Sequence, residues 1–184
     1  IYACLRKTKR CTNMPTKTAK KFKKTPAGKI PMDWEYKKIS EICEVGRGRV
    51  ISQGEIDNNP GPYPVFSSQS MNSGIMGSIS KYDFDGEYLT WTTDGAYAGT
   101  VFHRTGRFNC TNVCGTLKAS TPEISLKFLA HELQTKTFRN VVKCGNPKLM
   151  NNIMGDIHVA IPPKAEQIRI AEILSSVEDA INKT

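Results

Sequence analysis

The middle of the chain alternates short apolar runs with turn-forming residues. From about residue 49 to residue 118, runs rich in β-branched and aromatic residues are separated by Gly, Asn, Asp and Pro. The runs are Tyr63–Phe66, Ile75–Ser80, Tyr88–Thr93, Gly99–His103 and Val113–Lys118, and a turn is expected at Thr105-Gly106 between the last two. This spacing predicts a compact, mostly antiparallel sheet with polar loops at its edges.

Helical spacing of apolar residues flanks this region on both sides. Before it, Ile39, Ile42 and Cys43 predict one face of a short helix that Asp33 caps. After it, Thr121-Pro122-Glu123 has the residues of a helix start, with Thr as the cap and Pro at the first helical position. That helix is expected to bury Leu126, Leu129, Ala130, Leu133, Val141 and Val142. A strand is expected at Ile157–Ile161, which Pro162-Pro163 closes.

A second helix is predicted over residues 164–183. Its apolar residues Ile170, Leu174, Val177 and Ile181 are spaced by four, three and four positions, as in the start of a heptad seam. About two heptads are too few for a stable isolated helix, so we expect these four to lie exposed or to pack on another helix or copy. Since the seam stops at Thr184, we expect the natural chain to continue. The predicted fold class is α+β, with the sheet domain over residues 30–163 and a coiled-coil-type helix over 164–184.

Positive charge is concentrated at one end of the chain. Residues 1–30 hold ten of the 26 basic residues and no acid, which leaves 16 basic against 17 acidic residues in the remainder. The net charge of +9 therefore reflects the first segment and not a basic folded domain. We interpret residues 1–29 as a basic flexible leader.

Composition places the protein outside several classes. No stretch approaches the roughly 18 apolar residues that span a membrane, and no export signal opens the chain. The six cysteines follow no regular framework, so we expect reduced thiols in a cytoplasm. From the lack of an apolar span we expect no membrane partner.

The motifs that resemble catalytic ones are incomplete. Val45-Gly46-Arg47-Gly48-Arg49 lacks the third glycine of a dinucleotide loop. Glu35-x-Lys37 lacks the upstream acid that a nuclease metal site requires. A thiol nucleophile at Cys144 would need His131 or His158 beside it, which no sequence pattern indicates.

One cysteine pair could suggest zinc. Cys110 and Cys114, with His103 nearby, supply only one of the two pairs that a structural site needs. On a single strand Cys110, Asn112 and Cys114 would share one face, and half-buried cysteines are the simpler interpretation. The sequence therefore predicts no catalytic residue, no metal and no cofactor.

Four stretches carry a resemblance to a known family. They are Phe22–Glu35, with Gly28-Lys29-Ile30-Pro31-Met32-Asp33-Trp34 before a short helix; Leu89–Val101, around Gly95-Ala96-Tyr97-Ala98-Gly99; Leu129–Asn146, a helix and a Gly-centred loop; and Ile161–Ala171, with Pro162-Pro163-Lys164-Ala165-Glu166-Gln167. In this order they resemble one target-recognition domain of the DNA-specificity subunit of type I restriction-modification systems, with the start of its conserved helix. Two features depart from the family: Asn146-Pro147-Lys148 follows Gly145, where small hydroxylated residues are commoner, and the leader before Phe22 has no counterpart.

The resemblance implies a non-catalytic protein that reads one half of a split double-stranded DNA target. It also implies partners: methyltransferase (modification) subunits, a restriction/translocase subunit, and a second recognition domain in the same chain or in a homodimer. Two alternatives stay open. The chain could be the recognition end of a single polypeptide that also methylates and cuts, or a module that binds RNA or protein.

Loop residues able to contact DNA are the candidate site. Glycines on both sides of Arg47 would let the backbone approach a phosphate, and Asn146 has an amide able to pair with adenine. The alternative for each candidate is an ordinary solvated loop. The candidates are Arg47, Arg49, Ser68, Gln69, Thr93, Tyr97, Lys143, Asn146 and Lys148, and the candidate partner interface is Ile170, Leu174, Val177 and Ile181.

Overall fold

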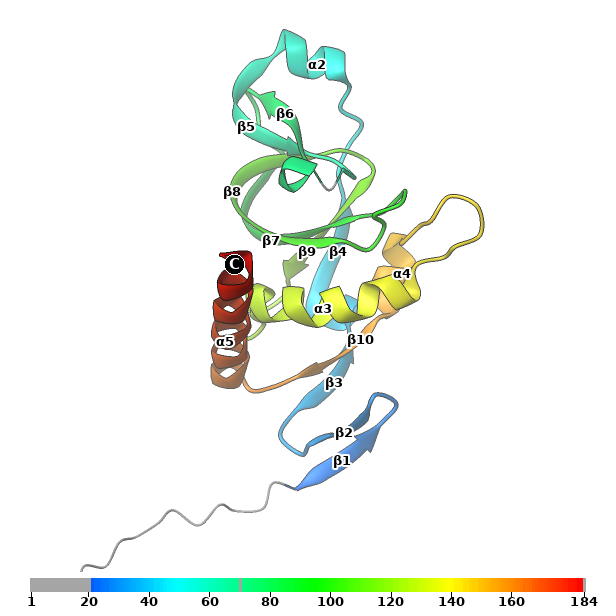
Figure 1. The fold of residues 1–184 in the computed structure, drawn as a ribbon, viewed down its shortest axis with the longest axis vertical. Helices are drawn as coiled ribbons and strands as arrows, with labels where there is room; N and C mark the ends of the chain where they lie inside the picture. The colour runs from blue at the N-terminus through cyan, green and yellow to red at the C-terminus, as the bar shows by residue number, and fades with distance from the viewer. Residues whose placement is uncertain (1–20, 70, 184) are drawn as a thin grey trace, which may run out of the picture. The chain divides into compact units, whose positions relative to one another are not determined.

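The chain divides into two compact units, Ile1–Met32 and Asp33–Thr184. This computed structural model describes residues 21–69 and 71–183, and the side chains of all of these except 71 and 182. In the first unit, β1 (Phe22–Thr25) and β2 (Gly28–Pro31) form an antiparallel hairpin (Figure 1). All other elements belong to the second unit.

A tight turn explains why the lysine-rich segment forms a hairpin. Gly28 has a φ of 108°, which glycine adopts readily and other residues rarely. The Thr25 hydroxyl donates a hydrogen bond to the Gly28 carbonyl across the turn (2.9 Å). Residues 22–29, which the sequence assigned to a flexible leader, therefore belong to a hairpin. Residues 1–20 lie outside the described residues.

A six-stranded sheet is the centre of the second unit. Its strand order is β4-β9-β7-β8-β5-β6, and every neighbouring pair is antiparallel except β5 and β8. This confirms the predicted, mostly antiparallel sheet. The strands are β4 (Cys43–Arg47), β5 (Pro60–Phe66), β6 (Ile75–Ile79), β7 (Phe84–Thr92), β8 (Val101–Cys110) and β9 (Cys114–Ala119).

The long strands β7 and β8 curve strongly (Figure 1). Gly86 lies opposite Gly106, and both have positive φ angles, 117° and 87°. The predicted turn at Thr105-Gly106 is therefore wrong, because Gly106 bends a continuous strand instead of ending it. The chain turns later, at residues 111–113 between β8 and β9.

A small two-stranded sheet links the beginning and the end of this unit. β3 (Glu35–Lys38) pairs antiparallel with β10 (His158–Ile161), which lies in the strand predicted at residues 157–161. Because β3 extends the backbone up to Lys38, α1 (Ile39–Ile42) begins there and not at Asp33. The Glu41 carboxylate accepts a hydrogen bond from the Lys38 N–H (2.7 Å), and Cys43 already belongs to β4.

The central helix α3 (Leu126–Asn140) begins later than predicted. Its N-cap is Ser125, whose hydroxyl accepts a hydrogen bond from the Phe128 N–H, and not Thr121. The four leucine and alanine positions of the expected stripe are buried. Val141 and Val142 lie beyond the helix, because Val142 pairs with Lys148 through two backbone hydrogen bonds. Two short helices, α2 (Gln53–Asn58) and α4 (Asn151–Asp156), and the 3-10 turn η1 (Met71–Gly74) were not predicted.

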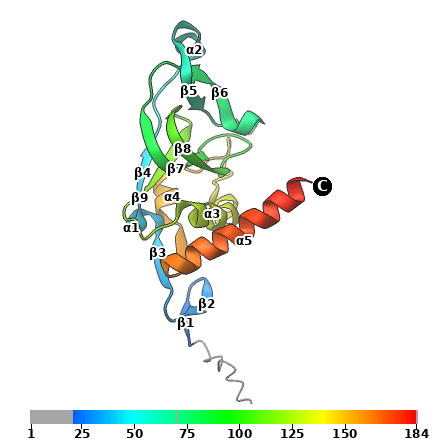
Figure 2. The ribbon, with the colours of Figure 1, turned by 90° about the vertical axis from the view of Figure 1, so that its left-hand side faces the viewer.

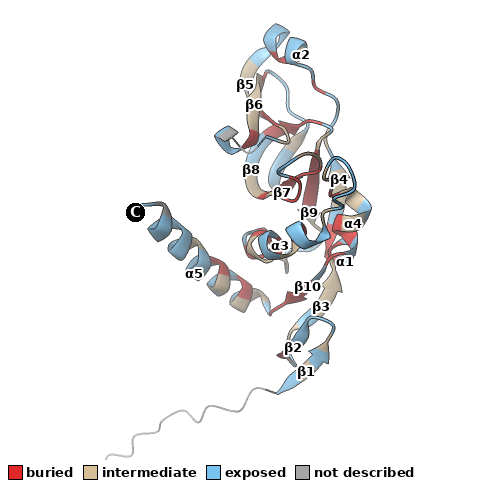
Figure 3. Cartoon of the chain, turned by 45° about the vertical axis from the view of Figure 1, so that its right-hand side comes forward, coloured by how far each residue is buried: buried red, intermediate tan, exposed pale blue. Residues whose placement is uncertain are grey.

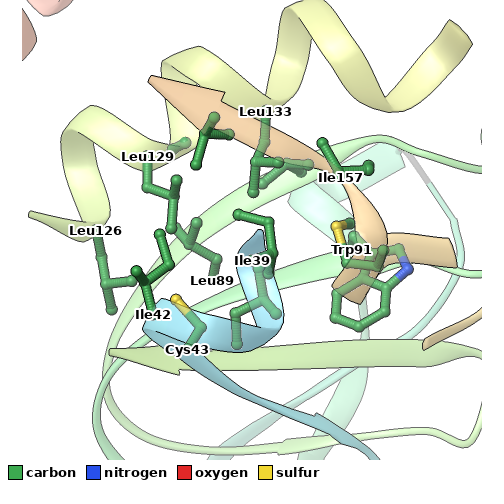
Figure 4. Close-up of a cluster of buried hydrophobic side chains, with 14 of the residues drawn as sticks. Ile39, Ile42, Cys43, Leu89, Trp91, Leu126, Leu129, Leu133 and Ile157 are labelled. Carbon is green, nitrogen blue, oxygen red and sulfur yellow. The ribbon is translucent and has the colours of Figure 1, made fainter. Parts of the chain in front are cut away.

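The main hydrophobic core lies between the sheet and the helices α1 and α3 (Figure 4). Trp91 is fully buried in it, and its indole N–H donates a hydrogen bond to the Leu149 carbonyl (2.9 Å). The ring packs directly on the backbone of Gly115, where an added Cβ would lie 2.2 Å from Trp91 Cζ2. Trp91 therefore joins two adjacent strands to the segment that follows α3.

The predicted C-terminal helix is α5 (Lys164–Asn182), whose end extends away from the sheet (Figure 2), and buried residues occur only in its first turns (Figure 3). Gln167 is 1% exposed. Its side-chain carbonyl accepts a hydrogen bond from the Ser125 N–H (2.8 Å), and its side-chain NH2 donates hydrogen bonds to Glu123 O (3.0 Å) and Pro162 O (2.8 Å). His131 of α3 contacts the hydroxyl of Ser175 and the carboxylate of Glu178. Among the described residues, we find no helix that combines the length and the apolar character needed to span a membrane.

The four seam residues of α5 differ in exposure. Ile170 is half-buried and packs against the main core. Leu174, Val177 and Ile181 are 39%, 50% and 67% exposed, so exposure rises toward the end of the helix. Their role as a partner interface stays a prediction.

We predict that Gly115→Ala destabilises the second unit by about 1–3 kcal/mol, because the new methyl group overlaps the buried Trp91 ring. Urea denaturation measures the change. Gly54→Ala is the matched control: Gly54 is exposed in α2, and its added Cβ meets no atom closer than 3.9 Å. This control should leave stability unchanged or raise it slightly. Equal stability of the two variants would contradict the packing described for Trp91.

We also predict that Gln167→Leu destabilises the protein, because it removes the partners of one partly buried N–H and two carbonyl groups. The expected cost is about 1–3 kcal/mol for each group that stays unsatisfied. Gln134→Leu on the exposed side of α3 is the control and should change stability by less than about 0.5 kcal/mol. Calorimetric melting compares the two, and an unaltered melting temperature for Gln167→Leu would refute this anchoring of α5.

Candidate nucleic-acid interface

Four segments of the second unit meet at one end of the sheet: residues 47–49, 93–98, 111–113 and 142–148. We call them the loop surface. Backbone hydrogen bonds of 2.9–3.1 Å join them, from Gly48 N–H to Cys114 O, from Thr93 N–H to Val113 O and from Gly95 N–H to Pro147 O. The segments are therefore held to one another and not free to move independently.

Asp94 organises the charges of this surface. Its carboxylate pairs with Arg47 Nη2 (3.3 Å) and with Lys148 Nζ (3.6 Å), and its side chain is 20% exposed. The Thr93 hydroxyl donates to the same carboxylate (2.6 Å) and accepts from Arg47 (3.0 Å). One acid thus fixes two cations and leaves this group, which we call the Asp94 cluster, with a net positive charge.

The structure brings several predicted residues together here. Arg47 and Lys148 belong to the Asp94 cluster, while Tyr97, Lys143 and Asn146 lie exposed on the two loops that the Gly95–Pro147 hydrogen bond joins. Tyr97 is 55% exposed. The surface therefore combines cations, an amide and an aromatic hydroxyl.

Thr93 has a different place from the one predicted. Its side chain is fully buried, because its backbone N–H and carbonyl bond to Val113 and Leu149 and hold it against the core. A direct contact with a base is therefore excluded in this conformation. Thr93 orients Arg47 and Asp94 instead.

Arg49 is neutralised by acids of its own chain. It pairs with Glu55 (2.6 Å) and Asp83 (2.9 Å), and the hydrogen bond from Arg49 holds the pKa of Glu55 below its usual value. Gly48 packs against the end of β8, where an added Cβ would lie 2.1 Å from Cys110 O. The glycine beside Arg49 is thus required by internal packing.

Ser68 and Gln69 belong to another loop, residues 67–74, between β5 and β6. The Gln69 amide donates to the Ile75 carbonyl, and the Ser67 N–H bonds to Gly74 O (2.8 Å). This loop touches the loop surface through the hydroxyls of Ser67 and Thr111 (3.3 Å). The two predicted residues therefore lie beside the loop surface and outside the Asp94 cluster.

Sequence reasoning missed two polar residues here, Asp94 and Arg104. Asp94 follows the predicted strand at Tyr88–Thr93 directly, a position from which strand-end loops often bind ligands. Arg104 lies in β8, one residue beyond the predicted strand Gly99–His103, and the turn expected next to it concealed the alternation. Burial lowers the pKa of Arg104 below the usual value of an arginine.

The cysteines do not lie as the sequence suggested. Cys110 ends β8 and Cys114 begins β9, so they lie on different strands and not on one face of a single strand; both are buried. Burial also raises the pKa of Cys43 to about 12, which keeps that thiol protonated at neutral pH. No three His, Cys, Asp or Glu side chains come together as a metal site within residues 21–69 and 71–183.

Comparisons with known proteins agree on one family. The family model described as "Type I restriction modification DNA specificity domain" matches residues 31–184. "Putative type I specificity subunit S.MpnORF289P N-terminus" of Mycoplasma pneumoniae is 50% identical over 140 residues, 76% of this chain and 75% of that protein. The "Type I restriction enzyme MpnII specificity subunit" of the same organism is 43% identical over 150 residues, 81% of this chain and 45% of that protein.

Solved structures share the fold. An S subunit of a type I restriction-modification system from M. genitalium superposes with a TM-score of 0.67 at 18% identity, over 82% of this chain and 40% of that one. The HsdS subunit from Thermoanaerobacter tengcongensis gives 0.66 at 15% identity, over 88% and 41%. The chain thus spans about two fifths of these two solved subunits.

We predict that Arg49→Met destabilises the protein at neutral pH with a pH dependence set by Glu55. Because the folded state lowers the pKa of Glu55, the pair stabilises the fold above the usual carboxyl pKa, and this contribution is lost as pH falls through the lowered value. Urea midpoints of wild type and variant should differ at pH 7 and converge in acid. Lys37→Met, which removes an ion pair with both side chains exposed, should change little at either pH. A constant Arg49→Met difference across the range would contradict this pairing.

Proposed function

We propose that the loop surface is the part of the chain that contacts DNA, because the chain belongs to the family of type I restriction-modification DNA specificity domains. Domains of this family recognise the DNA target. The observation that carries this proposal is the Asp94 cluster. It joins three of the four segments, so that cations able to bind phosphates and exposed side chains able to read bases occupy one surface. Contacts to phosphate position a protein on DNA, and contacts to base edges supply specificity.

The charge of the loop surface suits this role. Apart from Arg49, whose two acids neutralise it, the four segments contain the basic residues Arg47, Lys143 and Lys148 and the single acid Asp94. We assign Arg47 and Lys148 to phosphates, because Asp94 holds both side chains in place. We assign Asn146, on the open tip around Gly145, to a base edge, because its amide can both donate and accept.

The wider complex is proposed on the same basis. The chain would read one half of a bipartite duplex target, with a second recognition domain reading the other half. Methyltransferase subunits and a restriction/translocase subunit would supply catalysis, and the chain itself none. The exposed apolar face of α5, with Leu174, Val177 and Ile181, is suited to packing on another helix of such a complex. Action on cellular DNA would place the protein in the cytoplasm.

We predict different losses for the two kinds of contact in the complex assembled with its modification subunits. Arg47→Met should weaken the target duplex and random duplexes alike and lower the salt slope of binding by about one unit. Asn146→Ala should cost about 1–3 kcal/mol on the target and little on random DNA. Titrations at several salt concentrations measure both, with the target taken from the sites that the complex methylates.

Lys127→Met is the matched control, because it removes one exposed charge from α3 outside the loop surface. It should leave affinity and salt slope nearly unchanged. If Arg47→Met behaved like this control and Asn146→Ala like wild type, the loop surface would not be the DNA-contacting face. If RNA of the same sequence competed as well as the DNA duplex, the RNA-binding alternative would be favoured.

A further inference from the structure

Arg104 is held in an unusual position for a cation. Its guanidinium carbon lies 3.7 Å from the centre of the Phe66 ring and 4.4 Å from that of Phe102, which comes two residues earlier in the same strand. Its hydrogen bonds go to neutral acceptors, Ser73 O (2.5 Å) and, more weakly, Thr90 Oγ1 (3.4 Å). No carboxylate among the described residues forms an ion pair with it.

The other arginines of the same region show how uncommon this is. Arg49 has two carboxylates and Arg107 has Asp85 at 3.0 Å, although both are more exposed than Arg104. A half-buried cation without a counterion has lost part of its hydration and has only neutral groups in return, which is unfavourable. The apolar rings beneath it also lower the local dielectric, which strengthens attraction to any anion that arrives. Among the described residues, Arg104 is therefore a half-buried cation without a carboxylate partner, a position that an anionic ligand would complete.

The surroundings of Arg104 point toward the loop surface. Ser73, which accepts from its Nη2, lies in the loop 67–74, and that loop contacts Thr111 through Ser67. In this loop Asn72 and Ser73 have positive φ angles of 49° and 52°, followed by Gly74 at 83°. Three consecutive left-handed residues bring the Ser73 carbonyl onto the guanidinium. Arg104 thus contacts a loop that adjoins the loop surface.

We propose that Arg104 binds a phosphate of the DNA backbone beside the loop 67–74, which extends the contact area from the loop surface across the end of β5. The inference rests on the proposed function. A phosphate is favoured over a base for two reasons. The Phe66 and Phe102 rings cover the face of the guanidinium, so a ligand can reach only the N–H groups at its edge. Only an anionic ligand, moreover, compensates the positive charge. Two hydrogen bonds account for two of the five N–H donors of an arginine, so the fork retains donors for phosphate oxygens.

The test compares Arg104→Met with Arg107→Met in the full subunit assembled with its modification subunits. Both residues lie in β8 and both substitutions remove one positive charge, but Arg107 already has a carboxylate partner. Arg104→Met should weaken target and random duplexes by a similar factor, about tenfold at low salt, and lower the salt slope by about one unit. Arg107→Met should leave the slope nearly unchanged. Equal slopes for the two variants would overturn the proposal.

A second measurement identifies the phosphate itself. Duplexes in which one phosphate at a time is replaced by a neutral methylphosphonate should reveal one position that weakens wild type but has no further effect on Arg104→Met. Absence of such a position would contradict a phosphate contact. If Arg104→Met does not melt cooperatively, Arg104→Lys takes its place: it should keep the salt slope, and the effect of the same methylphosphonate should change in size. No change at any position would again overturn the proposal.

The two proposals fail in distinguishable ways. If Arg47→Met and Asn146→Ala lose binding while Arg104→Met does not, the loop surface stands and the phosphate contact of Arg104 is refuted. If the wild-type complex binds the sequence that it methylates no better than random DNA, the proposed function itself is refuted. The inference on Arg104 is then refuted with it.

Discussion

The packing of Trp91 on Gly115 is the interaction on which the rest of the second unit depends. The ring needs a residue without a side chain beneath it, and its N–H needs an acceptor inside the core, which the Leu149 carbonyl supplies. The Leu149 N–H in turn bonds to Thr93 O, so the chain beyond α3 is fixed against the end of β7. The placement of the loops therefore depends on core packing. Trp91 and the Leu149 backbone together hold the segments 93–98 and 142–148 of the loop surface.

Electrostatics then separates arginines that look alike in the sequence. Arg49 has two carboxylates, Arg47 shares one with Lys148, and Arg104 has no carboxylate partner among the described residues. An arginine with its own acids gains little from a phosphate, because it must first give up those pairs. The number of counterions thus ranks these residues as DNA contacts, with Arg104 and Arg47 before Arg49.

Local patterns predicted much of the fold, since alternating apolar residues around Val65, Leu89 and Leu117 and the helical stripe of α3 depend on neighbouring positions only. Features that depend on distant partners were not predictable. The helix α1 begins only at Ile39 because β3 pairs with β10 up to Lys38, and Gly106 continues a strand because Gly86 lies opposite it. The candidate site followed the same rule: loop positions could be predicted, but Asp83, one of the two acids that neutralise Arg49, lies 34 residues away in the sequence and reaches it only by folding.

The native Cys144 offers the most direct test of the central claim that the loop surface contacts DNA. It lies exposed on the loop 142–148, and Cys43, Cys110 and Cys114, the other cysteines of the described residues, are buried. In a background where Cys4 and Cys11 are replaced by Ser, the assembled complex is incubated with duplexes that carry a thiol tether on single bases. We predict a disulfide cross-link from Cys144 to a few adjacent positions within the target half-site. Cross-linking of a cysteine introduced at Lys127 in a Cys144→Ser background, with none at Cys144, would contradict it.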